Sequence, residues 1–132
     1  MTLALEEARS HGLPLVMDAD ALFMLADGND LGLSAIIGYP MCVLTPNKME
    51  FKLLCSAALR LISSDKNIKV AGSGSGGAVD SSDEVIEGLQ SEYADLQVQA
   101  LARALRVTVL LKGADDLICD GSEAVPRVYV IA

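Results

Sequence analysis

Three short stretches of the sequence combine polar side chains with turn-forming residues in patterns suited to ligand binding. They are DAD at 18–20, TPNKMEF at 45–51 and KGADD at 112–116. In DAD, two carboxylates could clasp a divalent cation, or one of them could cap the helix that follows. In KGADD, a lysine charge stands beside a glycine that lets the backbone approach an anion closely. The alternative for that lysine is simply to leave a sheet for solvent.

The junction at 45–51 also has two interpretations. Pro46 keeps Thr45 extended. Asn47 suits the N-cap of a helix, and Glu50 at the third helical position could reach back to the Asn47 amide in a capping box. Capping alone therefore explains both residues. The functional alternative is that the amides of the helix start, together with the Asn47 side chain, face a polar ligand group.

Each of the three stretches follows an apolar run that predicts a strand. The runs at 13–17 and 41–44 are continuous and bounded by turn signals, which is typical of strands buried on both faces of a parallel sheet. Further strands are predicted over 106–111, 116–120 and 127–132.

Between the strands, spacing predicts helices over 2–11, 21–27, 48–62 and 89–105. The helix over 48–62 has Phe51, Leu54, Ala58 and Leu61 on its apolar side. The last helix has Leu89, Tyr93, Leu96 and Ala100. Strands that alternate with helices predict an α/β fold with a mainly parallel sheet. In such sheets ligands bind beyond the carboxyl ends of the strands, so the three polar stretches are predicted to share one site.

Composition narrows the possible partners. The chain has 132 residues, of which 52% are apolar, and this is enough for one domain core. A net charge of −8 disfavours nucleic acid and anionic membrane, which require a positive face. No apolar run approaches the roughly 20 residues of a membrane span. The N-terminus carries acids where a secretory leader would be positive, which predicts a protein that is not secreted.

The remaining polar features carry less information. The three cysteines lack the close spacing of zinc ligands and predict reduced, mostly buried thiols in a reducing compartment. His11 has no acidic partner in an interpretable motif and is predicted to lie at the surface. The segment from Val70 to Ala102 contains no Lys or Arg. Its first part, at about 70–88, is rich in Gly and Ser and predicts a mobile acidic surface insertion.

Taken in order, PLVMDADAL, VLTPNKMEFKLL and VLLKGADDLICDG resemble the ATP- or ADP-dependent NAD(P)H-hydrate dehydratases of the ribokinase-like superfamily. The resemblance covers roughly residues 10–69 and 90–132, with the acidic segment as an insertion in a partial domain over 1–132. It implies a lyase that repairs the S form of hydrated NADH or NADPH. With ATP or ADP and Mg²⁺, such enzymes phosphorylate the hydroxyl of the hydrated ring, and loss of phosphate restores the reduced cofactor.

The resemblance also implies roles for individual residues. The hydrated cofactor would be lined by Asn47, Lys48, Met49, Glu50, Phe51, Lys52 and Leu53. The nucleotide would lie along Lys112, Gly113, Ala114, Asp115 and Asp116. The family's Gly-x-Gly-Asp segment, which supplies the catalytic base, follows the strand equivalent to RVYVIA and is expected beyond Ala132. No catalytic residue is therefore assigned within this chain.

Because phosphoryl transfer depends on positioning and charge stabilisation, we expect the chain alone to be a poor catalyst, as a fragment or a truncated product. Two other functions remain open: a ribokinase-like small-molecule kinase, and a remnant that binds nucleotide or another subunit without turnover. A homo-oligomer and a cytoplasmic or mitochondrial location are further expectations.

Overall fold

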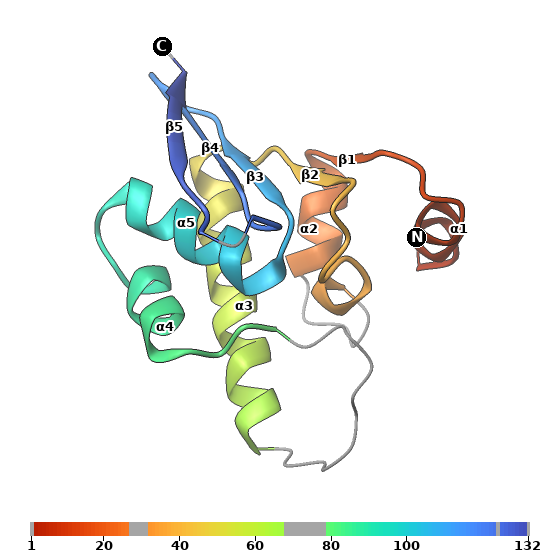
Figure 1. Ribbon diagram of the computed structural model, residues 1–132, viewed down its shortest axis with the longest axis horizontal. Coiled ribbons are helices and arrows are strands. Elements are labelled where there is room, and N and C mark those ends of the chain that lie inside the picture. Colours follow the sequence, from red (N-terminus) through yellow and green to blue (C-terminus); the bar gives the residue numbers. More distant parts are fainter. Residues whose placement is uncertain (1, 27–31, 68–78, 124, 132) are drawn as a thin grey trace.

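The computed structural model describes residues 2–26, 32–67, 79–123 and 125–131, which form one α/β unit (Figure 1). The predicted insertion falls partly on residues 68–78, which lie outside the described residues. In chain order the elements are α1 (Thr2–Ser10), β1 (Leu15–Met17), α2 (Asp20–Ala26), the 3₁₀ turn η1 (Leu33–Ala35), β2 (Cys42–Leu44), α3 (Lys48–Asn67), α4 (Asp83–Leu89), α5 (Ala94–Leu105), β3 (Thr108–Leu111), β4 (Asp116–Asp120) and β5 (Val128–Ile131).

The five strands form one mixed sheet in the order β1-β2-β3-β4-β5. The first three strands are parallel, as the alternation of strands and helices predicted, with Val16 opposite Val43 and Val43 opposite Thr108. The last two strands run antiparallel, because β3, β4 and β5 are joined by short connections rather than by crossover helices. The carboxyl ends of β1, β2 and β3 consequently lie at the same edge of the sheet.

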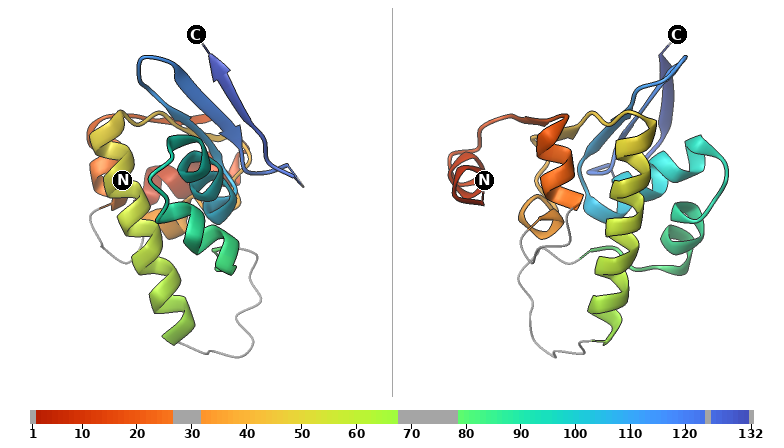
Figure 2. Two further views of the ribbon diagram at one scale, coloured as in Figure 1. Left: turned by 90° about the vertical axis from the view of Figure 1, so that its left-hand side faces the viewer. Right: turned by 180° about the vertical axis from the view of Figure 1, so that it is seen from behind.

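The helices α2, α3 and α5 pack on one face of this sheet, as the view from behind shows (Figure 2, right). That face carries the apolar core, which includes Leu44 and Val109 with no exposed surface. The prediction that the first strand is buried on both faces is wrong. Val16 is 67% exposed, because strand alternation directs it to the face opposite Met17 and the helices.

Helix α3 confirms the spacing argument and continues to Asn67, beyond the predicted end at residue 62. Phe51, Leu54 and Ala58 are buried against the core, while Leu61 is only partly buried.

A close backbone contact fixes the turn that follows β4. A Cβ on Gly121 would lie 1.8 Å from the Ala102 carbonyl oxygen of α5. Only glycine therefore allows the two backbones to approach this closely.

The helix predicted over 89–105 corresponds to α5, which begins only at Ala94, and a separate helix, α4, precedes it where the acidic insertion was predicted. Helix α4 begins at Asp83, and both Val79 and Val85 are buried in the core, so the chain from residue 79 onward is part of the fold. Tyr93 and Leu96 were expected on the apolar side of that helix, but they are 63% and 46% exposed because α5 begins only at Ala94.

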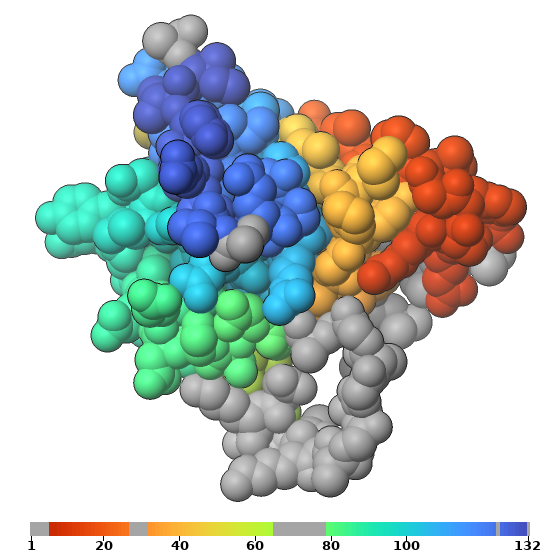
Figure 3. All heavy atoms as spheres, viewed as in Figure 1, coloured from red at the N-terminus to blue at the C-terminus, as the bar shows by residue number. Residues whose placement is uncertain are grey.

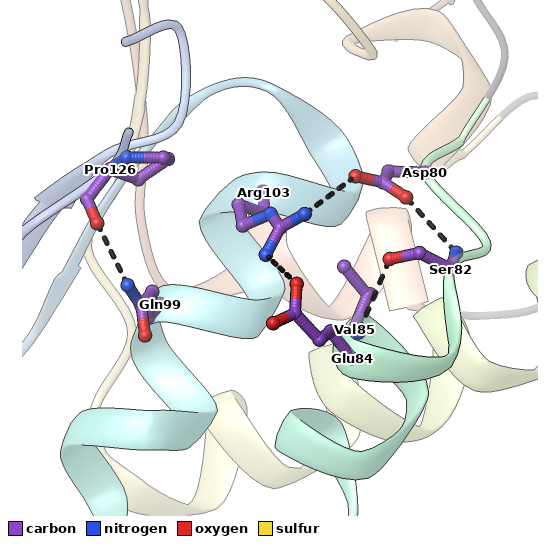
Figure 4. A network of polar contacts seen from close by, with 7 residues as sticks. All are labelled: Asp80, Ser82, Glu84, Val85, Gln99, Arg103 and Pro126. Atoms are coloured by element: carbon purple, nitrogen blue, oxygen red, sulfur yellow. Dashed lines mark hydrogen bonds and ion pairs between the residues drawn. The ribbon is translucent and has the colours of Figure 1, made fainter. Parts of the chain in front are cut away.

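Polar contacts attach α4 to α5 (Figure 4). Arg103 of α5 lies 3.0 Å from Glu84 and 3.7 Å from Asp80, and Ser82 caps α4 by accepting a hydrogen bond from the Val85 amide at 3.4 Å. The Gln99 side chain donates to the Pro126 carbonyl at 2.8 Å, which connects α5 to the chain before β5. These contacts hold the acidic segment onto α5, which in turn packs on β3 and β4.

The molecular surface shows the same arrangement of the helices and strands. In the space-filling view, the blue surface of β4 and β5 lies between the green and cyan surface of α4 and α5 and the orange and red N-terminal elements (Figure 3). Among the described helices, none combines the length and the apolar character that a membrane crossing requires.

Candidate functional site

The loop after β1 is a tight turn built around an unusual backbone conformation. Ala19 has a φ of 49°, a left-handed value that residues other than glycine and asparagine rarely adopt. The Ala19 amide donates to Asp18 Oδ1 at 2.9 Å, and the Ala21 amide donates to the Asp18 carbonyl at 3.1 Å. These bonds hold the Asp18 carboxylate at the carboxyl edge of the sheet, immediately before α2 begins at Asp20.

The loop after β2 forms the capping box that the sequence predicts. The Glu50 amide donates to Asn47 Oδ1 at 2.9 Å, and the Asn47 amide donates to Glu50 Oε1 at 2.9 Å. The loop is also attached to β1, because the Thr45 amide donates to the Met17 carbonyl at 3.1 Å. The Asn47 side-chain oxygen and the Glu50 carboxylate, which the ligand interpretation would use, are therefore both engaged within the helix start.

The loop after β3 packs against the other two. The Lys112 amide donates to the Pro46 carbonyl at 2.9 Å, and the Lys112 ammonium lies 3.2 Å from Asp18 Oδ1. The Gly113 amide donates to Asp116 Oδ1 at 3.0 Å. We call 18–20, 45–51 and 112–116 the edge loops. The structure confirms that they converge at one edge of the sheet.

The electrostatics of the edge loops centre on Asp18. The Lys112 ammonium and then the Ala19 amide hold the pKa of the Asp18 carboxyl below its usual value, because both stabilise the ionised form. A second lysine lies nearby, since Lys48 Cε is 3.8 Å from the position that a Cβ on Gly113 would occupy. Two lysines from different edge loops thus flank the turn at Gly113, where the carboxylates of Asp18 and Asp116 also lie.

The predicted cofactor-lining residues separate into two groups. Phe51 is 3% exposed and Glu50 is 8% exposed, so both face the interior. Asn47, Lys48 and Lys52 are exposed, as are Met49 at 64% and Leu53 at 38%. The exposed members are therefore the ones that a ligand can reach.

Along the predicted nucleotide stretch, the side chains remain accessible. Gly113, Ala114 and Asp115 are exposed, while Lys112 and Asp116 are partly exposed. Asp116 is the first residue of β4 and closes the turn through Gly113, so its carboxylate has a structural contact of its own.

One further residue of the site, Asp18, was missed as a partner of Lys112. Its signal was present in DAD, but the sequence offered only a helix cap or a metal ligand. The described residues contain no group of three or more His, Cys, Asp or Glu side chains able to hold an ion, and Asp18 is engaged with Lys112.

A separate groove lies away from the edge loops. It has a volume of about 490 Å³, lies between α4 and α5, and is lined in part by Glu84, Tyr93 and Arg103. None of the residues that line it belongs to the edge loops.

Comparisons with known proteins show which family the chain is similar to. A family profile described as NAD(P)H-hydrate dehydratase matches residues 1–128. Curated proteins named ATP-dependent (S)-NAD(P)H-hydrate dehydratase are similar over most of the chain. The one from Physcomitrium patens is 34% identical over 95% of this chain and 31% of its own length. Those from Emericella nidulans and Dictyostelium discoideum are 33% and 30% identical, each over 92% of this chain and over 28% and 30% of their own lengths. The chain thus spans about three tenths of the length of these relatives.

Proposed function

Because the chain belongs to the NAD(P)H-hydrate dehydratase family, we propose that the edge loops at 112–116 and 45–51 bind ATP and the S form of hydrated NADH or NADPH, respectively, for nucleotide-dependent dehydration. The observation that carries the proposal is the convergence of two lysines and a helix start at one sheet edge. The relatives' names support ATP as the nucleotide.

In this proposal the nucleotide lies along 112–116. Lys112 supplies a compact positive charge, and the absence of a side chain at Gly113 leaves room for phosphate oxygens. The nicotinamide end of the hydrated cofactor lies over the exposed start of α3, from Asn47 to Leu53. Lys48 stands between the two ligands, where the phosphoryl group would pass from ATP to the ring hydroxyl.

Three carboxylates of the edge loops are engaged in contacts that suit positioning rather than proton abstraction. Asp18 faces Lys112, Glu50 faces the Asn47 amide and Asp116 faces the Gly113 amide. Each of these three carboxylates therefore has a hydrogen-bonded partner that fixes its orientation. These contacts support a chain that contributes binding groups, and no base is assigned among them.

The described residues do not fit a resident Mg²⁺ site, so no step is assigned to the metal. We propose that Mg²⁺ enters with the nucleotide, because this ion is usually held by substrate phosphates with one or two carboxylates and several waters. The three free cysteines, all buried, favour a reducing compartment, cytoplasmic or mitochondrial.

The proposal is tested by two measurements on the full chain. Calorimetric titration with ATP and Mg²⁺, and then with S-hydrated NADH, measures binding. Recovery of NADH absorbance from S-hydrated NADH and ATP measures turnover. Binding of both ligands supports the proposal, and NADH recovery would show that the chain also supplies catalysis. Failure of either ligand to bind the folded chain would refute it.

A further inference from the structure

We propose that Asp18 is a positioning residue for Lys112: its carboxylate holds the lysine ammonium at the sheet edge, ready to receive a nucleotide phosphate. The inference rests on the proposed nucleotide site for its functional consequence. Its geometric content, an ion pair that fixes the lysine, can be measured without any ligand.

The two residues meet only because the sheet brings them together. They are 94 positions apart in the sequence, and the Lys112 ammonium lies 3.2 Å from Asp18 Oδ1. The side chains of Lys112 and Asp18 are 43% and 53% exposed, so the pair lies at an open edge that a ligand can enter.

Both ends of this contact are fixed by backbone bonds. On the Asp18 side, the left-handed Ala19 turns its amide onto the same oxygen that Lys112 contacts. Such a conformation is unfavourable for alanine and persists where the surrounding structure enforces it. On the lysine side, the Lys112 amide is held by the Pro46 carbonyl. Between these two fixed points only the side chain of Lys112 is free to change rotamer, and the contact with Asp18 restricts its rotamers.

The positioning role predicts the direction in which loss of the Asp18 charge changes ATP affinity. A lysine chain loses rotamer freedom when it engages a phosphate, and Asp18 imposes part of that loss beforehand. Positioning therefore predicts that removing the Asp18 charge weakens nucleotide binding. Simple electrostatics predicts the opposite, because a nearby negative charge repels an anionic phosphate. The two explanations differ in the direction of the change.

The test compares Asp18→Asn with Asp20→Asn in the full chain. Both variants remove one negative charge from the same loop, but Lys112 pairs with Asp18. At low ionic strength, where exposed pairs are least screened, we expect Asp18→Asn to weaken ATP affinity by about two- to fivefold. Asp20→Asn should leave the affinity equal or slightly higher. In a Lys112→Ala background, Asp18→Asn should cause no further loss, because the partner is already gone.

Tighter ATP binding by Asp18→Asn, or an equal loss in both single variants, would overturn the positioning role. Side-chain NMR of the ligand-free chain separates this outcome from failure of the proposed function. NMR relaxation at Lys112 Cε should report a more mobile side chain in Asp18→Asn and an unchanged one in Asp20→Asn. If the wild-type chain binds no ATP, the proposed nucleotide site is refuted. If the mobility of the Lys112 side chain is unchanged in Asp18→Asn, the ion pair itself is refuted.

Discussion

The capping box at the start of α3 offers a decisive perturbation, because the same residues were candidates for ligand binding. Glu50→Ala removes the acceptor of the Asn47 amide, whose bond to Glu50 Oε1 is 2.9 Å long. Glu50 is only 8% exposed, so the substitution also removes a buried side-chain stem. Glu50→Gln is the matched control, since a glutamine oxygen can accept the same bond.

The expected magnitude follows from the loss of a cap and its packing. Loss of an N-terminal cap costs about 1 kcal/mol, and the lost stem brings the expected fall in the free energy of unfolding to about 1–2 kcal/mol. For a chain of this size, that corresponds to a fall in Tm of about 3–8 °C. Glu50→Gln should remain within about 0.5 kcal/mol of the wild type. Urea unfolding followed by circular dichroism measures both variants.

Two results would refute this reasoning. If Glu50→Ala unfolds at the same urea concentration as the wild type, the capping box does not stabilise α3. If Glu50→Gln is as unstable as Glu50→Ala, the stabilising element is the charge near the helix N-terminus rather than the hydrogen bond. A stable Glu50→Gln that has lost affinity for the hydrated cofactor would instead show that the carboxylate itself binds ligand.

Two further predictions concern packing and buried thiols. Gly121→Ala places a Cβ 1.8 Å from the Ala102 carbonyl oxygen and should destabilise the fold by about 3 kcal/mol or more in urea unfolding. Gly113→Ala, whose nearest contact would be 3.4 Å, is the control, and an equally stable Gly121→Ala would contradict the packing. Burial raises the pKa of Cys42 and Cys55 to about 12 and of Cys119 to about 11. The unfolded chain therefore releases thiol protons first, and stability should fall as pH rises above about 9. A thiol reagent should react with these cysteines only upon unfolding, and rapid reaction of the native chain would contradict their burial.

Local sequence determined much of the fold, because the relevant interactions span few residues. The capping box joins positions 47 and 50, and Pro46 and Asn47 mark the end of a strand and the start of a helix within two residues. Period-two and period-3.6 patterns located the strands and α3 for the same reason. Placing the three polar stretches at strand ends was also sufficient to predict that they converge.

Residues 79–93 could not be interpreted in this way. The acidic composition indicated an exposed insertion, yet Val79 and Val85 pack into the core and Arg103 pairs with Asp80 and Glu84. Acidic residues on one side of a short helix leave its apolar side free to pack, and composition does not distinguish the two sides.

The sequence by itself determined the chemistry available at the sheet edge: which loops carry lysines, carboxylates and glycine, and in what order. The tertiary structure alone decided how these groups are paired. Asp18 meets Lys112 across 94 positions, and Lys48 approaches Gly113, because parallel strands bring their carboxyl ends to one edge. The antiparallel direction of the last two strands and the packing of α2, α3 and α5 on one face of the sheet could not be predicted from the sequence, since both depend on contacts between different elements.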